Sequence, residues 1–243
     1  MRLRRLHVAV ELRSGATIDL PERSARHAAQ VLRMRAGDEA IGFDGQGRQF
    51  RIRLVSSTRH GVRAEVIEEV SPLPESPLQI TLAHGLSRRE KMDWVMQKAT
   101  ELGVARIVPV ITERSVVRLD SARADKRLAH WEAVIAHACE QSGRAVLPLV
   151  SHPIRLGDFL AERNRDDAGI VLDPDSPTRL ADIDLSPVIL TLLVGPEGGL
   201  TRDEAEAAQS NGFIAAALGP RTQRTETAAL TGLALAQARW GDL

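Results

Sequence analysis

Apolar and polar positions follow two different rhythms along the chain, one on each side of a short proline-rich segment. Before that segment, residues 62–66 alternate Val-Arg-Ala-Glu-Val, the period of two that is typical of a strand with one buried face. The dipeptide Asp44-Gly45 stands between two apolar segments, where it favours a hairpin turn. Residues 21–35 place their alanines and a leucine at helical spacing. These patterns predict a small, mostly β domain with one helix over residues 1–72.

After the proline-rich segment, apolar runs of strand length alternate with helical patterns. The predicted strands are residues 78–83, 105–112, 168–173, 188–194 and 213–218. The predicted helices are residues 91–102, 120–142, 202–209 and 225–240. Strands that alternate with helices form mainly parallel sheets with helices on both faces, so an α/β domain is predicted over residues 78–243. Trp94 lies within the apolar face of its helix and is expected in the core.

The boundary between these parts is placed at residues 71–77, which hold three prolines. Proline fixes φ and lacks the backbone N–H donor, so neither a helix nor a central strand is expected to pass through this segment. The segment therefore predicts a linker between two domains.

Composition places the chain among ordinary globular proteins, because 43% of its 243 residues are apolar and 26% are charged. No stretch approaches the 18 consecutive apolar residues that suggest a membrane span. The basic N-terminus lacks the apolar block of a signal peptide. Cys139 is the single cysteine, so an internal disulfide is impossible. We expect a cytoplasmic protein with no membrane association.

The net charge of zero hides an asymmetry between the two parts. Residues 1–70 hold 13 arginines and 9 acidic residues, whereas residues 71–243 hold 19 basic and 23 acidic residues. A basic segment beside an acidic one favours a module that binds a polyanion such as RNA. The alternative is a solvated, arginine-rich surface, and charge alone leaves both open.

Ligand-binding features gather where the predicted strands end. Irregular, glycine- and proline-containing segments follow three strands, at residues 172–174, 195–199 and 218–221. In parallel sheets, ligands bind outside the carboxyl ends of the strands. Thr201 and Glu204 form a predicted capping box at the next helix, and its acidic first turn disfavours a phosphate there.

Several familiar signatures are missing from the chain. It has no GxxxxGK[ST] loop, no GxGxxG after a strand, no GxSxG elbow, and neither HExxH nor CxxC. His130, His137 and Cys139 are close in sequence, but packing or surface roles explain them more simply, so no metal is predicted. Arg221 and Arg224, in "LGPRTQRTETAAL", are either solvated arginines or members of a site.

Together, "VGPEGGLTRDEAEAA" and "LGPRTQRTETAALTGLALAQARWGDL" resemble the 16S ribosomal RNA uracil-N3 methyltransferases (small-subunit methyltransferase E) of the SPOUT superfamily. "EKMDWVMQKATELGVARIVPVITERSVVRL", "HACEQSGRAVLP" and "HAAQVLRMRAGDEAIGFDGQG" extend the resemblance over nearly the whole chain, in the expected order.

The resemblance implies an α/β SPOUT domain with a mainly parallel sheet, a C-terminal trefoil knot and a small N-terminal PUA-like β-barrel that helps to hold RNA. It implies a homodimer that uses S-adenosyl-L-methionine (SAM) to methylate N3 of a uridine in 16S rRNA of the 30S subunit. The alternatives are a SPOUT methyltransferase that acts on tRNA, and a non-catalytic RNA-binding assembly factor.

The resemblance also implies roles for individual residues. The cofactor-binding residues are Leu172, Val194, Gly195, Pro196, Glu197, Gly198, Gly199, Leu218, Gly219, Pro220, Arg221, Arg224 and Thr225. The catalytic candidates are Arg221 and Arg224, either of which could stabilise charge on the uracil, and Glu197 and Glu226, either of which could accept a proton or serve as a structural acceptor. The RNA-binding candidates are Arg2, Arg4, Arg5, Arg26, Arg33, Arg35, Arg88, Arg89, Arg114 and Arg144.

One feature departs from the family pattern. Thr222-Gln223 stands where the family usually has two apolar residues, just before Arg224-Thr225-Glu226. The apolar wall against the adenine is therefore expected to be either weaker or rebuilt in this chain.

Overall fold

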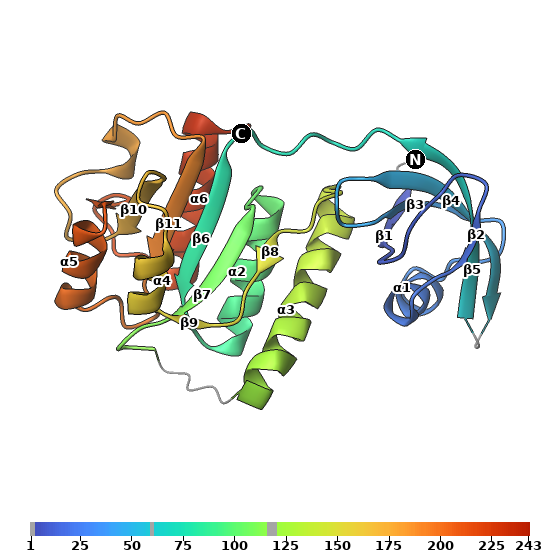
Figure 1. The fold of residues 1–243 in the computed structure, drawn as a ribbon, viewed down its shortest axis with the longest axis horizontal. Helices are drawn as coiled ribbons and strands as arrows, with labels where there is room; N and C mark the ends of the chain where they lie inside the picture. The colour runs from blue at the N-terminus through green and yellow to red at the C-terminus, as the bar shows by residue number, and fades with distance from the viewer. Residues whose placement is uncertain (1–2, 59–60, 116–120) are drawn as a thin grey trace. The chain divides into compact units, whose positions relative to one another are not determined.

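A computed structural model describes residues 3–58, 61–115 and 121–243 (Figure 1). The chain forms two compact units, the first containing residues up to Glu75 together with Ala136–Leu147, and the second containing Ser76–Ile135 and Pro148–Leu243. The division between Glu75 and Ser76 falls inside the predicted linker. Ala136–Leu147, which the sequence placed in the α/β domain, belong instead to the first unit, because helical periodicity shows which face is apolar but not what packs on it.

The first unit is built on a five-stranded sheet. Its strands are β1 (Arg4–His7), β2 (Thr17–Asp19), β3 (Glu39–Phe43), β4 (Gln49–Thr58) and β5 (Gly61–Val70), in the order β1-β3-β4-β5-β2. β1 and β3 are parallel and the other pairs are antiparallel. In the expected small barrel, β1 and β2 are thus the two outermost strands of one sheet.

The expected hairpin and helix of this unit are both present. β3 and β4 pair across residues 44–48, where the Asp44 carboxylate accepts hydrogen bonds from the backbone N–H groups of Gln46 and Arg48. The helix is divided into α1 (Glu22–Arg26) and a π-helical turn, η1 (His27–Val31). Ala25 and Ala28 are buried in the same apolar core as strand residues such as Ile52.

The second unit contains a seven-stranded parallel sheet and the helices around it. The strands are β6 (Gln79–Gly85), β7 (Arg106–Ile111), β8 (Leu149–Val150), β9 (Ile154–Arg155), β10 (Ala168–Leu172), β11 (Ile189–Val194) and β12 (Phe213–Ala216). Their order is β12-β10-β11-β6-β7-β8, and β9 also pairs with β7. The helices are α2 (Arg89–Glu101), α4 (Leu156–Glu162), α5 (Arg202–Ser210), α6 (Thr225–Trp240) and the short 3-10 helix η2 (Leu180–Asp182). Helix α3 (Ser121–Ser142) belongs to this unit up to Ile135 and to the first unit from Ala136.

Side chains alternate between the two faces of this sheet. Val171 and Leu193 belong to an apolar cluster with α4 and α5. Their neighbours in the two strands, Leu172 after Val171 and Leu192 before Leu193, lie instead against Gly232 of α6. Both faces are therefore covered, as the continuous apolar runs predicted.

The five predicted strands and four predicted helices of the second part are all present. The sequence missed β8, β9, α4 and η2, which are short. It was wrong about Trp94, whose exposed fraction is 51%. The Lys98 ammonium lies 5.3 Å from the centroid of that indole ring, so a cation covers the ring in place of the core.

Among residues 3–58, 61–115 and 121–243, no helix is both long and apolar enough to cross a membrane. The trefoil knot stays a prediction, because strand order alone does not establish how the chain threads through its loops.

Candidate active site

Three loops meet at one edge of the parallel sheet of the second unit. They follow β10, β11 and β12, which are adjacent in the order β12-β10-β11 and run in the same direction. Their carboxyl ends therefore lie side by side, although up to 44 residues separate them in sequence. This is the edge at which the sequence predicted a ligand.

A cavity of about 830 Å³ opens among these loops. Its lining contains twelve of the thirteen predicted cofactor residues: Leu172, Val194, Gly195, Pro196, Glu197, Gly198, Gly199, Leu218, Gly219, Arg221, Arg224 and Thr225. Pro220, the remaining one, does not line it. The sequence missed other lining residues, among them Lys91, Arg114 and Asp173.

Close backbone approach explains the glycines of the loop after β11, residues 195–200. The backbone N–H of Gly199 donates to the Pro196 carbonyl, and the φ of Gly199 is 71°, a left-handed value. A Cβ on Gly195 would lie 2.8 Å from the Leu200 nitrogen and 2.9 Å from the Gly199 carbonyl carbon. The loop is thus a tight turn whose interior has no room for a side chain.

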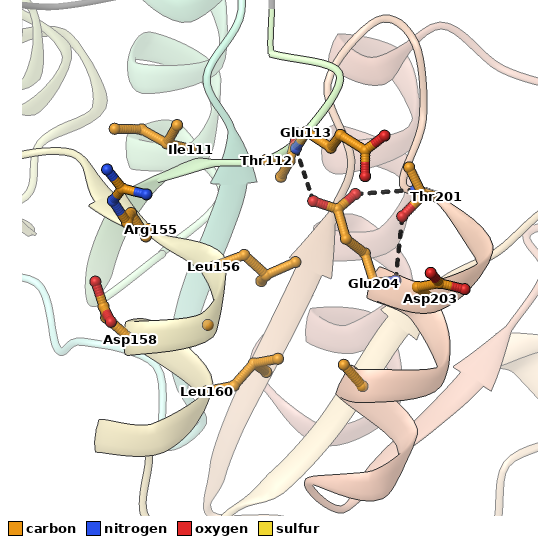
Figure 2. A pocket seen from close by; sticks show the side chains of 12 residues that line it. Ile111, Thr112, Glu113, Arg155, Leu156, Asp158, Leu160, Thr201, Asp203 and Glu204 are labelled. Carbon is orange, nitrogen blue, oxygen red and sulfur yellow. Dashed lines mark hydrogen bonds between the residues drawn. The ribbon is translucent and has the colours of Figure 1, made fainter.

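The predicted capping box ends this loop (Figure 2). Thr201 Oγ1 accepts from the Glu204 backbone N–H at 3.2 Å, and Glu204 Oε2 accepts from the Thr201 N–H at 2.9 Å. Glu204 Oε1 also accepts from the Glu113 backbone N–H at 2.8 Å, which ties the start of α5 to the segment after β7. The acidic turn is therefore engaged in holding the scaffold, and the helix start is not a free anion site.

A buried polar chain anchors the start of α6 to the same loop. Thr225 Oγ1 donates to the Gly195 carbonyl at 2.5 Å. His84 Nε2 lies 3.2 Å from the same Thr225 Oγ1. Since the single hydroxyl proton of Thr225 is used in the hydrogen bond to Gly195, His84 must donate to Thr225 Oγ1 through Nε2. Burial lowers the pKa of His84 to about 4, so the ring is neutral at pH 7. Gly195 and Thr225 are in this way held at fixed positions.

Glu197 is fixed by its neighbours in α2. Its Oε1 accepts from the Arg88 backbone N–H at 3.2 Å and lies 3.8 Å from Lys91 Nζ. Arg88 is the N-cap of α2, and Glu197 accepts from its backbone N–H, the role that a glutamate three residues into the helix has in a capping box. Burial alone would raise the pKa of Glu197, but the backbone hydrogen bonds and the charge of Lys91 outweigh it and lower the pKa.

Glu226 lies on the other side of Lys91. Its Oε2 is 3.2 Å from Lys91 Nζ, in an ion pair rather than an aligned hydrogen bond, and the carboxylate is 17% exposed. Lys91 itself is 28% exposed and lines the cavity. The two predicted carboxylates thus share one ammonium. In the part of the chain that the structure describes, a hydrogen bond also holds Glu197, whereas Glu226 Oε2 has none. Sequence spacing could not reveal Lys91, because it comes from a helix more than 100 residues upstream.

The loop after β12 contributes exposed cations and an amide. Arg221 and Arg224 line the cavity with exposed side chains. Within the described ranges 3–58, 61–115 and 121–243, neither guanidinium forms an ion pair with a carboxylate. Gln223 also lines the cavity, and its Oε1 is buried without a hydrogen-bond partner. A buried amide oxygen without a partner, in a residue that lines a cavity, is a candidate acceptor for a ligand donor.

The predicted RNA-binding arginines fall into several environments, and Arg2 lies outside the described residues. Arg33, Arg35 and Arg88 are exposed. Arg4, Arg26 and Arg89 are near acidic side chains at the surface. Arg114 instead donates to the carbonyls of Gly198 and Leu200, at 2.9 and 3.3 Å. It therefore supports the glycine loop.

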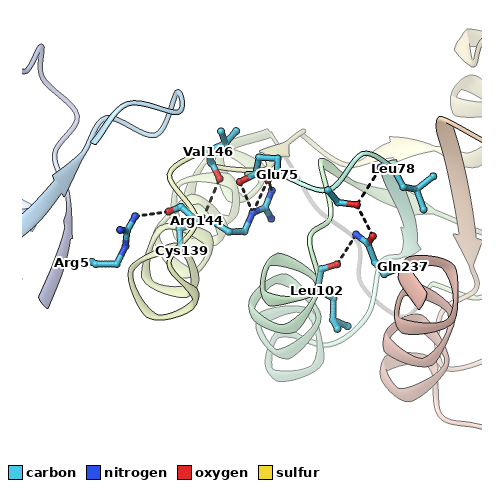
Figure 3. Close-up of polar contacts among 9 residues, drawn as sticks. Arg5, Glu75, Leu78, Leu102, Cys139, Arg144, Val146 and Gln237 are labelled. Atoms are coloured by element: carbon cyan, nitrogen blue, oxygen red, sulfur yellow. Dashed lines mark hydrogen bonds and ion pairs between the residues drawn. The ribbon is translucent and has the colours of Figure 1, made fainter. Parts of the chain in front are cut away.

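Arg5 and Arg144 take part in a network of the first unit (Figure 3). The Arg144 side chain is 11% exposed and pairs with the Glu75 carboxylate, with Nε 3.0 Å from Oε2. Arg5 donates to the Arg144 carbonyl at 3.0 Å and to Gln49 Oε1 at 2.7 Å. These contacts hold the segment after α3 within the unit. The side chains of Arg5 and Arg144 therefore have structural partners.

A separate network ties the linker end to α6 within the second unit (Figure 3). Gln237 is fully buried; its Oε1 accepts from the Ser76 hydroxyl at 2.7 Å, and its Nε2 donates to the Leu102 carbonyl at 3.0 Å. Ser76 Oγ in turn accepts from the Leu78 backbone N–H at 3.2 Å. The amide thus links the start of the unit to α6 and to the end of α2.

The His130, His137 and Cys139 set weighed in the sequence does not come together. His130 Nε2 lies 2.9 Å from both carboxylate oxygens of Asp93. Cys139 Sγ faces the Val146 carbonyl, and burial raises the pKa of the thiol to about 12. A neutral buried thiol is a poor metal ligand.

The cavity fits the cofactor that the resemblance implies. Its volume lies within the range of small-molecule sites, which is about 300–1,000 Å³. Its lining contains carboxylates that can receive the cationic sulfonium and ammonium, namely Asp173, Asp175, Glu197 and Glu206, together with five cations, namely Lys91, Arg114, Arg202, Arg221 and Arg224. The unpaired buried oxygens of Glu197 and Gln223 would meet the donors of SAM, namely its ammonium, ribose hydroxyls and adenine amino group.

Comparison with known proteins agrees with this geometry. A family described as the RNA methyltransferase domain matches residues 74–237, and the RNA methyltransferase PUA domain matches residues 20–67. The chain is 31% identical over 232 residues to ribosomal RNA small subunit methyltransferase E of Bacillus subtilis, covering 92% of this chain and 90% of that protein. The chain belongs to the ribosomal RNA small subunit methyltransferase E family.

Other members of this family extend the likeness. The Mycobacterium bovis protein is 36% identical over 213 residues, covering 85% of this chain and 80% of that one. The crystal structure of the Neisseria gonorrhoeae enzyme bound to S-adenosyl methionine has a TM-score of 0.93 and 38% identity, with both chains fully covered. A putative methyltransferase from Legionella pneumophila, in complex with SAM, has a TM-score of 0.96 and 35% identity, again with full coverage.

Membership in the family confirms the predicted fold class and activity class. The fold is an α/β SPOUT methyltransferase domain with a PUA-type N-terminal domain, and the activity is that of an RNA methyltransferase. The roles assigned to single residues stay predictions.

Proposed function

We propose that this protein transfers the methyl group of SAM to N3 of a uridine in 16S rRNA of the small ribosomal subunit. One observation supports this above the others: the SAM-sized cavity is bordered by two exposed, cavity-lining guanidiniums, Arg221 and Arg224, in a member of this family. Two relatives of 35% and 38% identity over the full chain are described as bound to the same cofactor.

The reaction needs charge stabilisation at the uracil. When bound, SAM supplies an electrophilic methyl group on its sulfonium sulfur. The N3–H bond of uracil breaks, an N3–carbon bond forms, the carbon–sulfur bond breaks, and S-adenosylhomocysteine leaves. Negative charge develops on O2 and O4 of uracil as the proton departs, and Arg224 or Arg221 stabilises it. The cavity walls hold the reacting groups in line.

Proton removal falls to Glu226 rather than Glu197. Glu197 already accepts a hydrogen bond from Arg88 N–H, and its lowered pKa makes it a weak base. Glu226 is not part of the cavity lining; among the described residues its Oε2 meets only the ammonium of Lys91, which does line the cavity, and movement of that ammonium would release the carboxylate. Glu197 then serves as the structural acceptor that joins the glycine loop to α2.

RNA binding is assigned to Arg33, Arg35 and Arg88, whose exposed side chains form no ion pair within residues 3–58, 61–115 and 121–243. Each lost phosphate contact is expected to change the slope of log affinity against log salt by about one.

We further propose a cytoplasmic homodimer, the oligomeric state that the family resemblance implies. Sedimentation equilibrium of the full chain tests the dimer directly.

The test of this function is one set of incubations with methyl-labelled SAM. Undermodified 30S subunits, naked 16S RNA and tRNA are offered separately, and the products are digested to nucleosides and separated. We expect label in N3-methyluridine from 30S subunits or 16S RNA, and none from tRNA. Label only in tRNA would overturn the proposed substrate.

A binding control separates failure of catalysis from failure of cofactor binding. Calorimetric titration with S-adenosylhomocysteine is expected to show saturable binding for the wild type. Absence of both binding and label would reject the methyltransferase assignment, whereas binding without label in any RNA would reject the substrate.

A further inference from the structure

Glu140 of the first unit is held between two histidine rings. Its Oε1 accepts from the His7 backbone N–H at 2.9 Å, which fixes the carboxylate, and its side chain is only 9% exposed. Its Oε2 points toward both rings, 2.8 Å from His137 Nδ1 and 3.6 Å from His27 Nε2. His27, His137 and Glu140 each offer one ligand atom, and these three atoms lie within 4.8 Å of one another.

The three residues come from two elements that are far apart in sequence. His137 and Glu140 are three residues apart on α3, so they share one face of that helix. His27 begins the π-helical turn η1, and such turns occur frequently at functional sites. The two imidazole rings are 5.0 Å apart between centroids. The cluster is reachable from solvent, because the His137 side chain is 48% exposed.

We propose that His27, His137 and Glu140 form a binding site for a divalent cation of the zinc class. Two imidazole nitrogens and a carboxylate oxygen are a donor set that zinc uses, and they leave a fourth position for water. Magnesium and calcium prefer sets made of oxygen ligands, so they are not expected here. The proposal departs from the absence of a metal that was expected from the sequence.

The spacing is close to what one zinc ion requires. Zinc–nitrogen and zinc–oxygen bonds of about 2.0–2.2 Å at a tetrahedral centre place neighbouring ligand atoms roughly 3.3–3.5 Å apart. The two distances from Glu140 Oε2, 2.8 and 3.6 Å, bracket this value. The ligand atoms of the two rings lie within 4.8 Å of each other, and the exposed His137 ring can turn toward the ion at the surface. The hydrogen bond from His7 N–H to Oε1 would orient the ligating carboxylate, as outer partners do in metal sites.

The protonation states of the ligands agree with this geometry. Burial lowers the pKa of His27 below its ordinary value of 6.5, which favours the neutral ring that binds metals. For Glu140, burial opposes ionisation, but hydrogen bonds from His137 and from the His7 backbone outweigh it and lower the pKa. The site thus offers a carboxylate and a neutral imidazole near pH 7.

The bound ion would join η1 to the end of α3 within the first unit. Its ligands are far in sequence from the cavity residues. The ion is expected to raise the Tm of the protein, because a ligand that binds only the folded state stabilises it. The experiment therefore measures binding and stability, and needs no RNA substrate.

The test titrates Zn²⁺, and Mg²⁺ in parallel, into the full-length, tag-free protein after treatment with a chelator and dialysis. We expect one zinc equivalent with a Kd below about 10 µM and a rise in Tm of a few degrees, with no response to Mg²⁺. Co²⁺ in place of Zn²⁺ is expected to give the visible absorption of a four-coordinate ion. No saturable binding of Zn²⁺ by the wild type would overturn the proposal.

Matched variants locate the site. His137→Gln removes an exposed ligand with little risk to folding, and Glu140→Gln keeps an acceptor for the His7 N–H. Each is expected to weaken zinc binding at least tenfold. His130→Gln is the control, because His130 lies on the same helix but pairs with Asp93. Unchanged affinity in His137→Gln, or an equal loss in His130→Gln, would reject this site.

Discussion

The loop after β11 is held in place by its neighbours, whereas the loop after β12 leaves its reactive side chains exposed. In the first loop, Gly195 accepts from Thr225, Glu197 accepts from the Arg88 backbone, and Gly198 accepts from Arg114. In the second, Arg221 and Arg224 are exposed. One wall of the cavity is thus positioned before any ligand arrives, and the other has charges that a ligand must order.

This difference divides the work of the site. A preformed wall lowers the entropic cost of holding a cofactor, because its backbone groups need not be reorganised. Exposed guanidiniums can follow a large, charged substrate as it docks, and their interactions strengthen once water is excluded. Changes in the first wall should therefore affect stability and cofactor affinity, and changes in the second should affect the rate.

The largest effect is expected from removing the charge at the open wall. Arg224→Ala should lower the single-turnover rate with bound SAM by about 100-fold or more, the range seen when one stabilising donor is lost from a transition state. Cofactor affinity should change little. Rapid-quench methyl transfer and calorimetry with S-adenosylhomocysteine measure the two quantities.

Arg13→Ala, which changes an exposed arginine of the first unit that is not among the candidate site residues, is the matched control for Arg224→Ala. It should leave the single-turnover rate unchanged. If Arg224→Ala instead weakened S-adenosylhomocysteine binding and spared the rate, the division between the two walls would be wrong.

The two carboxylates beside Lys91 give the next largest effect. Glu226→Gln should slow methyl transfer by roughly 100-fold and flatten the acidic side of the pH–rate profile, since it removes the proton acceptor. Glu197→Gln keeps a carbonyl oxygen for the Arg88 N–H and should slow the rate less than tenfold. Single-turnover rates between pH 5 and 9 decide between them, and wild-type rates for both would exclude a carboxylate base.

Acidic pH should weaken the fixed wall through His84. A buried ring with a pKa of about 4, against 6.5 in the unfolded chain, stabilises the protein above pH 6.5, and this contribution is lost as the pH falls toward 4. The loss is about 2 kcal/mol of unfolding free energy at pH 5 and about 3 kcal/mol at pH 4. Urea unfolding at pH 7.5 and 5.0 measures it.

His84→Gln retains an N–H donor for Thr225 but cannot take up the proton in this pH range. Its unfolding free energy should therefore fall less than that of the wild type between pH 7.5 and 5.0. Equal pH dependence in the two proteins would show that His84 is not the group that titrates.

The smallest effect concerns Gln223, which replaces an apolar residue of the family pattern. Its buried, unpaired Oε1 should accept a hydrogen bond from the cofactor, so Gln223→Leu should weaken S-adenosylhomocysteine binding by two- to tenfold, which corresponds to about 0.5–1.5 kcal/mol. Thr222→Val, a neighbouring substitution in the same lining, is the comparison. Tighter binding of S-adenosylhomocysteine by Gln223→Leu would show that the buried amide weakens cofactor binding and makes no compensating hydrogen bond.

Local patterns were sufficient for most of the fold. The apolar runs that became β6, β10 and β11 are long enough for fully buried strands, and the alternation with helices dictates a parallel sheet. The capping box of Thr201 and Glu204 was predicted because its bonds span only three residues. β8 and β9, two residues each, were missed since so short a run has no period to detect.

The candidate site was predictable only where it is contiguous in sequence. The glycine loop and the segment around Arg224 stand out as strings of unusual residues. Lys91 and Arg114 lie in ordinary-looking segments, and nothing in their spacing marks them as neighbours of the cavity. Trp94 illustrates the opposite error, because membership in an apolar helical face does not ensure that another element covers the side chain.

The amino-acid sequence by itself determined the strands, the helices, the tight turn at Gly195–Gly199 and the family, since each depends on residues close together along the chain. Only the tertiary structure decided that Lys91 joins Glu197 and Glu226, that Arg114 supports the glycine loop, and that His27 meets Glu140. All four contacts join residues separated by 84 to 135 positions. The geometry of packed elements, rather than any local preference, brings such residues together.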